Sequence, residues 1–149
     1  MKRILFGRVE LAPDDRFILD TALGLHAGTR ERVGVTYPTL HLEVARGDTL
    51  LLNDGHIVLW VDEVRDTEVR CKVVVGGNLS NSKGINKLGG GLSAPALTDK
   101  DKEDIEFAAR IEADYLAVSF VRAAEDVNTA RQLLREAGGH GGIVSKIER

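Results

Sequence analysis

The sequence is poor in the residues on which several classes of function depend. Cys71 is its one cysteine, so neither an internal disulfide nor a cysteine-based metal site can form. A net charge of -3 and an aromatic content of 5% leave little to attract a phosphate backbone or to stack on bases. We therefore expect no binding to nucleic acid.

Long apolar runs are also missing. The first apolar stretch, Ile4-Leu5-Phe6, ends after three residues. A secretory signal requires an apolar region of roughly 7–15 residues, and a membrane-spanning helix requires roughly 18. The sequence therefore predicts no membrane association, and the cytoplasm is the expected location.

The composition is that of a globular chain. Hydrophobic residues make up 43% and charged residues 29% of the sequence, which is typical of folded soluble domains. A length of 149 residues suffices for one ordinary domain, or for a small domain and part of another. The pattern of residues changes near Gly89-Gly90-Gly91, which predicts a division into residues 1–92 and 93–149.

Residues 1–92 show short strand patterns separated by turns. Apolar residues recur at nearly every second position in His56–Val64 and in Glu68–Val75, with Arg65-Asp66-Thr67 between them as a hairpin turn. Asn53-Asp54-Gly55 predicts a second tight turn, in which Gly55 takes a positive φ. Further strands are expected at Ile4–Leu11, Phe17–Asp20, Arg32–Tyr37 and Thr49–Leu52. Short strands at this spacing predict a small closed β-barrel or a sandwich.

Residues 93–149 alternate between helical and strand patterns. The expected order is a helix capped by Thr98, a strand at Tyr115–Phe120, a helix from about Glu125 ended by Gly138, and a strand at Ile143–Ile147. Such alternation predicts parallel strands joined by helical crossovers. Both strands have the continuous apolar character of strands covered on two faces, which two helices cannot provide.

Lys146 and Glu148 are the most informative polar pair. They lie two positions apart, so both side chains project from one face at the end of the last strand. That end carries the chemistry of parallel α/β folds. A lysine there can neutralise a migrating phosphoryl group while a carboxylate holds a divalent metal. A solvent-exposed salt bridge would use the same two residues, and the pattern alone leaves both readings open.

The segment from Gly76 to Asn86 is rich in Gly, Ser and Asn and contains Lys83. It does not match a phosphate-binding P-loop, because Gly84 rather than Ser or Thr follows the lysine and no Gly directly precedes it. We interpret it as an ordinary loop. The four histidines are scattered without the spacing of metal ligands.

Five motifs together resemble the pyruvate kinase family, and Asn86–Ser93 is similar to its bacterial branch. In chain order the motifs are Leu50–Gly55, Val75–Asn86, Pro95–Asp101, Ser119–Arg122 and Ser145–Glu148. The resemblance implies an internal fragment of that enzyme. Residues 1–92 would be its small closed β-barrel lid, the B domain. Residues 93–149 would be two helix–strand units of an incomplete (β/α)8 catalytic barrel.

The resemblance also implies a reaction, cofactors and partners. The parent enzyme would transfer the phosphoryl group of phosphoenolpyruvate to ADP in glycolysis, giving pyruvate and ATP, and would be a cytoplasmic homotetramer that uses Mg²⁺ and K⁺. Lys146 would stabilise the phosphoryl group, Glu148 would bind Mg²⁺, Lys83 would reach the nucleotide phosphates, and Asp54 would approach the site from the lid. The K⁺ ligands would lie outside this chain.

Two other readings remain open. The chain alone is expected to be inactive, because the resemblance places the second Mg²⁺ carboxylate outside it as well. It would then be a structural fragment of the parent enzyme. Alternatively, it is a stand-alone β-barrel binding module with a short α/β tail.

Overall fold

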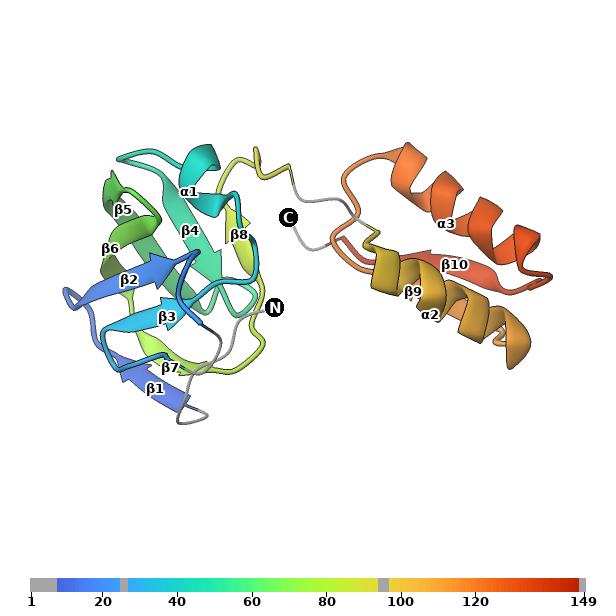
Figure 1. Ribbon diagram of the computed structural model, residues 1–149, viewed down its shortest axis with the longest axis horizontal. Coiled ribbons are helices and arrows are strands. Elements are labelled where there is room, and N and C mark those ends of the chain that lie inside the picture. Colours follow the sequence, from blue (N-terminus) through green and yellow to red (C-terminus); the bar gives the residue numbers. More distant parts are fainter. Residues whose placement is uncertain (1–7, 25–26, 94–96, 148–149) are drawn as a thin grey trace. The chain divides into compact units, whose positions relative to one another are not determined.

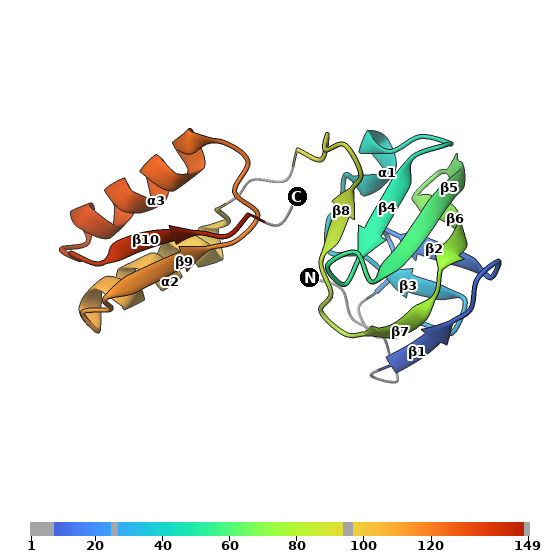
Figure 2. The same cartoon turned by 180° about the vertical axis from the view of Figure 1, so that it is seen from behind.

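The computed structural model describes residues 8–24, 27–93 and 97–147. The chain divides into two compact units, Met1–Ser93 and Ala94–Arg149. Figure 1 shows strands with one short helix in the first unit and alternating helices and strands in the second, and Figure 2 gives the view from behind. Within the described residues, no helix is both long enough and apolar enough to span a membrane.

The first, β-rich unit follows the expected strand pattern closely. In chain order it contains β1 (Arg8–Leu11), β2 (Arg16–Asp20), β3 (Arg32–Gly34), α1 (Leu40–Glu43), β4 (Thr49–Leu52), β5 (Ile57–Arg65), β6 (Glu68–Val75), β7 (Gly77–Ser80) and β8 (Ile85–Lys87). The expected strands Thr49–Leu52 and Glu68–Val75 are confirmed at both ends. Part of the expected strand Ile4–Leu11 lies outside the described residues.

Two sheets of this unit enclose one hydrophobic core. Six strands form a sheet in the order β3-β2-β6-β5-β4-β8, and β1 pairs with β7 in a second, two-stranded sheet. Buried residues alternate along β4, along β5 from Ile57 to Val61 and along β6 from Val69 to Val73, as the apolar alternation predicts. The buried side chains of both sheets form a single cluster that includes Phe17, Leu19, Leu40, Leu50, Leu52, Ile57, Leu59, Val61, Val69, Cys71, Val73 and Leu79.

The described strands do not by themselves show the closed barrel that the sequence predicts. Among the described residues, no ladder of hydrogen bonds joins β3 to β8, the two edge strands of the six-stranded sheet. Each of these edge strands has three residues, which offers few groups for closure. The sheet is therefore a curled half-barrel, and the β1–β7 pair packs on the same core without continuing the ladder.

The interpretation of residues 76–86 as a loop is wrong in part. The segment contains β7 and the start of β8, which pair antiparallel with β1 and β4. Gly76 permits a close approach of two backbones, because a Cβ at this position would lie 2.2 Å from the carbonyl oxygen of Leu11. A polar, glycine-rich composition thus concealed strands whose partners are remote in sequence.

The second unit has the expected helix–strand alternation. It contains α2 (Asp99–Arg110), β9 (Tyr115–Val118), α3 (Ala124–Glu136) and β10 (Gly142–Ser145). The strands β9 and β10 pair in parallel, as expected for strands joined by a helix. Thr98 caps α2 by accepting a hydrogen bond from the backbone of Asp101, and Gly138 has a φ of 86° after α3. Both predicted helix boundaries are confirmed.

The sheet of β9 and β10 is covered on one face only within this unit. Ile105, Ala109, Ala130 and Leu134 of the two helices pack with Val118 in a small core. On the other face, Tyr115 is 74% and Val144 45% exposed. Figure 2 shows these strands in front of α2. The continuous apolar character of the strands therefore corresponds to a sheet whose second face is uncovered in this unit.

Candidate functional site

The carboxyl ends of β9 and β10 lie side by side because the two strands are parallel and in register. Ser145 is opposite Val118 in the ladder, and the backbone N–H of Lys146 donates to the carbonyl oxygen of Val118 at 2.9 Å. One residue further along each strand are Lys146 and Ser119. Residues remote in sequence thus meet at the end of the sheet where ligands bind in parallel α/β folds.

Alternation along the strands places this pair on the face without helices. Tyr115 and Ala117 of β9, and Val144 of β10, are exposed, and Ser119 and Lys146 continue these alternating series. The ammonium nitrogen Nζ of Lys146 donates a hydrogen bond to the hydroxyl oxygen Oγ of Ser119 at 3.1 Å. Lys146 therefore presents a cation, held by a neutral hydroxyl, at the expected edge of the sheet.

Phe120, immediately after Ser119, has an uncommon backbone conformation. Its φ of 55° lies in the left-handed region, which is strained for a bulky side chain. Beyond it, the carboxylate oxygen Oδ2 of Asp126 accepts hydrogen bonds from the backbone N–H groups of Arg122, at 2.9 Å, and Ala123, at 3.2 Å. Such strain is retained where surrounding contacts hold the chain, and it is common at functional sites.

Glu148, the predicted Mg²⁺ ligand, lies outside the described residues. Among the residues that are described, no group of three or more His, Cys, Asp or Glu side chains could hold a metal ion. The donor set of the described residues therefore does not by itself fit a complete Mg²⁺ or K⁺ site. Glu148 as a metal ligand stays a prediction.

Lys83 lies between β7 and β8, beside the turn that contains Asp54. The backbone N–H of Asn53 donates to the carbonyl oxygen of Gly84 at 3.3 Å, and Leu52 at the end of β4 pairs with Ile85 at the start of β8. Asn53, Asp54 and Gly55 all have positive φ values, which confirms the predicted tight turn. Two features predicted separately from the sequence are thus adjacent at one end of the β-rich unit.

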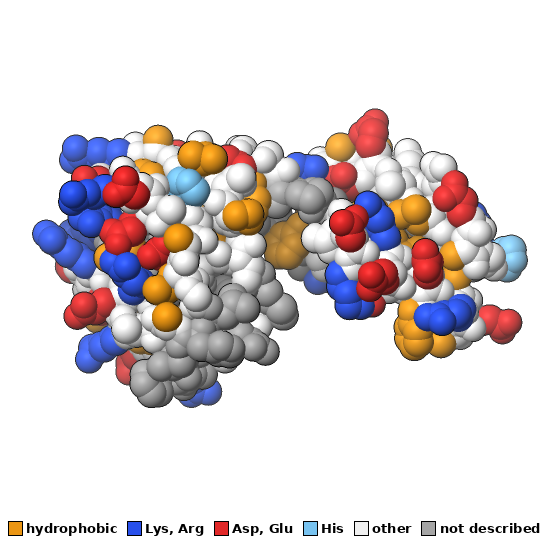
Figure 3. Space-filling model, in the orientation of Figure 1, with side chains coloured by type: hydrophobic (Ala, Val, Ile, Leu, Met, Phe, Trp, Pro, Cys, Tyr) orange, Lys and Arg blue, Asp and Glu red, His pale blue; other side chains and the backbone are white. Residues whose placement is uncertain are grey.

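Several charged side chains of the β-rich unit form ion pairs with each other. Arg32 forms ion pairs with Asp20 and Glu68, and Arg70 with Glu68 at 2.8 Å and Glu63 at 3.4 Å. Hydrogen bonding from Arg70 lowers the pKa of Glu68. Figure 3 shows basic and acidic side chains intermixed over β2, β5 and β6. Acidic side chains therefore partly offset the positive charge of Arg32 and Arg70.

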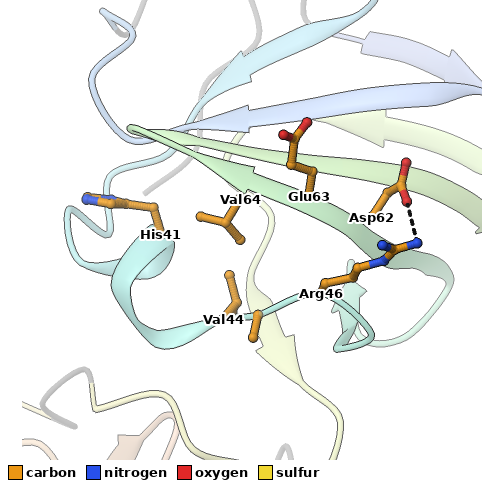
Figure 4. Close-up of a pocket in the computed structure, with 7 residues that line it drawn as sticks. His41, Val44, Arg46, Asp62, Glu63 and Val64 are labelled. Atoms are coloured by element: carbon orange, nitrogen blue, oxygen red, sulfur yellow. Dashed lines mark ion pairs between the residues drawn. The ribbon is translucent and has the colours of Figure 1, made fainter.

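A surface pocket beside α1 was not predicted from the sequence. It is lined by His41, Val44, Ala45, Arg46, Asp62, Glu63 and Val64. Figure 4 shows the two valines facing each other, with Arg46 and Asp62 joined by an ion pair of 3.9 Å at one side. The ring nitrogen Nδ1 of His41 lies 2.8 Å from the hydroxyl of Thr21, a contact that fits a structural role. The pocket therefore lacks the free cations that a phosphate ligand requires.

Comparisons with known proteins cover both units. The family model described as pyruvate kinase, barrel domain, matches residues 6–149. Pyruvate kinase II of Salmonella typhimurium is 56% identical over 143 residues, which is 96% of this chain and 30% of that protein. The pyruvate kinase of Haemophilus influenzae is 54% identical over 143 residues, with the same two shares. That of Buchnera aphidicola from Acyrthosiphon pisum is 49% identical over 149 residues, 100% of this chain and 31% of that protein.

Proposed function

The chain belongs to the pyruvate kinase family, and from this premise we propose that it contributes to the transfer of the phosphoryl group of phosphoenolpyruvate to ADP, giving pyruvate and ATP in glycolysis. The chain spans about 30% of the length of the relatives it matches. The family match runs through both units. It therefore favours this reading over a stand-alone β-barrel binding module.

Within that enzyme, residues 1–92 would be the lid and residues 93–149 two helix–strand units of the (β/α)8 catalytic barrel. The division into two compact units supports this assignment. The parallel pair β9–β10, with helices on one face only, also supports it, because in a (β/α)8 barrel helices cover the outer face of the sheet and strands face each other inside.

The position of Lys146 is the observation that most directly supports the proposal. Its side chain lies at the carboxyl end of β10, on the face without helices, where barrel enzymes place their reacting groups. There the ammonium group would donate hydrogen bonds to the oxygens of the phosphoryl group as that group moves between substrates. An ammonium already in place lowers the barrier without reorganisation at the moment of reaction.

Glu148 and Lys83 would have separate tasks. Glu148 would be a ligand of Mg²⁺, which supplies charge neutralisation on the phosphoryl oxygens when bound. The ammonium of Lys83 would contact the nucleotide phosphates when the lid closes, with Asp54 on the neighbouring turn approaching the same site. We place the K⁺ ligands outside this chain, and propose a cytoplasmic homotetramer as the full enzyme.

The proposal can be tested in a chimeric enzyme in which these 149 residues replace the matching segment of the Salmonella typhimurium pyruvate kinase II. Lys146→Met should lower kcat at least ~10²-fold with a smaller change in KM for phosphoenolpyruvate, because its charge acts mainly in the transition state. Added Mg²⁺ should not restore this rate. Glu148→Gln should instead weaken Mg²⁺ binding, so that a higher Mg²⁺ concentration recovers part of the rate.

Lys102→Met is the matched control, because Lys102 is a lysine of α2 that pairs with Asp99 at 2.8 Å. Its initial rates should equal those of the unsubstituted chimera at every Mg²⁺ concentration. Near-normal kcat values for both Lys146→Met and Glu148→Gln would mean that the two residues form a surface salt bridge, and the proposed site would be wrong.

A further inference from the structure

The contact between Lys146 and Ser119 has a consequence for how the lysine acts. A lysine side chain has four rotatable bonds, and ordering such a chain is opposed by its conformational entropy. A cation that must meet a moving phosphoryl group at one place therefore benefits from a second group that limits its positions. The hydroxyl oxygen of Ser119 lies 3.1 Å from the ammonium nitrogen of Lys146, within hydrogen-bond distance.

The fold places these two side chains opposite each other. The parallel register of β9 and β10 continues one residue past Val118 and Ser145, through the 2.9 Å hydrogen bond from the backbone of Lys146 to Val118. Residues opposite each other in a ladder project from the same face of the sheet. The contact is therefore set by the register of the strands, not only by the flexible ends of two side chains.

The chain on the far side of Ser119 is also held. Phe120 leaves the strand with a φ of 55°, which turns the backbone away from the extended direction. Asp126 then accepts the backbone N–H groups of Arg122 and Ala123. Ser119 is thus anchored by the β9 ladder before it and by this turn after it, so its hydroxyl occupies a defined place at the edge of the sheet.

The chemistry of the partner matters as much as its position. A carboxylate at this distance would offset the charge of the lysine and compete with the phosphoryl oxygens for it. A serine hydroxyl accepts one of the three hydrogen bonds that an ammonium can donate and carries no net charge. The contact with Ser119 therefore holds the ammonium group without offsetting its positive charge.

We propose that Ser119 is a positioning residue, whose hydroxyl holds the Lys146 ammonium at the carboxyl edge of β9 and β10 without neutralising it. This inference rests on the proposed function of Lys146 in phosphoryl transfer. It assigns Ser119 no contact with substrate, so the effect of Ser119 on the reaction must pass through the lysine.

The test is a double-mutant cycle in the chimeric enzyme. Ser119→Ala should lower kcat about tenfold, which corresponds to about 1.4 kcal/mol, with KM for phosphoenolpyruvate changed less than twofold. Ser119→Thr keeps a hydroxyl and should retain most of the rate. In the Lys146→Met background, Ser119→Ala should have little further effect, because the group that it positions is gone.

Thr129→Ala is the matched control. It removes a hydroxyl that donates to the carbonyl oxygen of Glu125 at 2.8 Å on α3, in the same unit, and should leave kcat unchanged. An unchanged kcat for Ser119→Ala would overturn the inference. So would an equal loss in the presence and absence of Lys146, which would assign the serine a purely structural role. A normal rate for Lys146→Met alone would instead contradict the proposed function.

Discussion

Glu43 accepts hydrogen bonds from two residues near it in the sequence and from one that is remote. Its carboxylate accepts from the hydroxyl of Tyr37 at 2.6 Å and that of Thr39 at 2.8 Å. It also accepts from the backbone N–H and the hydroxyl of Ser93, each at 2.7 Å. Ser93 is the last residue of the β-rich unit, and Glu43 is the last residue of α1. These hydrogen bonds therefore hold the end of the unit against α1.

These contacts change the ionisation of Glu43. Desolvation raises the pKa of Glu43, but the hydrogen bonds from Tyr37, Ser93 and Thr39 together outweigh this effect. The pKa therefore falls from 4.5 to about 2. Because the pKa is lower in the folded state, the charged carboxylate stabilises the fold above pH 4.5. That contribution is lost as the pH falls from 4.5 towards 2.

Glu43→Gln should therefore lower the free energy of unfolding of the β-rich unit by about 1 kcal/mol at pH 7. The difference should shrink as the pH falls towards 3. Trp60 of β5 is the sole tryptophan of the chain, so its fluorescence during urea unfolding reports on this unit. Glu31→Gln, at an exposed position, is the control and should have no effect. A loss of stability independent of pH would contradict the assigned role of the carboxylate.

The proposed contact of Lys83 with the nucleotide can be tested by a substitution that should not disturb the fold. In the described part of the chain, no ion pair or hydrogen bond engages its ammonium group. Lys83→Met in the chimeric enzyme should raise KM for ADP by about three- to tenfold, the scale of one charge-assisted contact with phosphate. KM for phosphoenolpyruvate should change less.

Lys72→Met is the matched control for this substitution. Lys72 lies on β6 and pairs with Asp14 at 2.7 Å, so it is already engaged and should leave both KM values unchanged. An unaltered KM for ADP in Lys83→Met would remove Lys83 from the nucleotide site.

At the scale of elements, stability should differ between the two units. The β-rich unit has a continuous core in which many side chains are fully buried. The pair β9–β10 has helices on one face and exposed Tyr115, Val144 and Ile147. We predict fast hydrogen exchange of the β9 and β10 amides in the monomeric 149-residue polypeptide, and slow exchange in β5 and β6, because exchange follows local burial.

The alternative outcome for these strands is self-association. If two copies cover each other's exposed sheet face, exchange in β9 and β10 should slow with increasing protein concentration. The measurement is amide exchange by NMR at two concentrations, with the association state determined by analytical ultracentrifugation. Slow exchange of β9 and β10 in a proven monomer would show that one covered face is sufficient.

At the scale of the whole molecule, the 149-residue polypeptide on its own should show no pyruvate kinase activity. Phosphoryl transfer depends on several charges held in one geometry. Lys146 and Glu148 are the two catalytic groups that the family resemblance assigns near the barrel edge. A coupled assay for pyruvate, with Mg²⁺ and K⁺ present, is the measurement. Turnover above background would show that the part of the relatives beyond these 30% of their length is dispensable.

The sequence predicted well those features that depend on neighbours along the chain. Thr98 and Gly138 mark helix ends because their contacts are made within one turn. The alternation in β5 identified its buried side, although a bulge between Val61 and Glu63 shifts the alternation so that Val64 again packs against the core. The short helix α1 was missed because four residues carry too little periodicity to detect.

Local pattern and motif order determined the family, the strands, the helices and the identity of Lys146, Lys83 and Glu148 as candidates. The tertiary structure alone decided that β7 pairs with β1, that the sheet is a curled half-barrel, and that Glu43 binds Ser93. It also placed Ser119 against Lys146. Alternating apolar residues predict which side of a strand is buried, but they do not predict which remote strand lies beside it. That choice depends on how all strands together enclose the core.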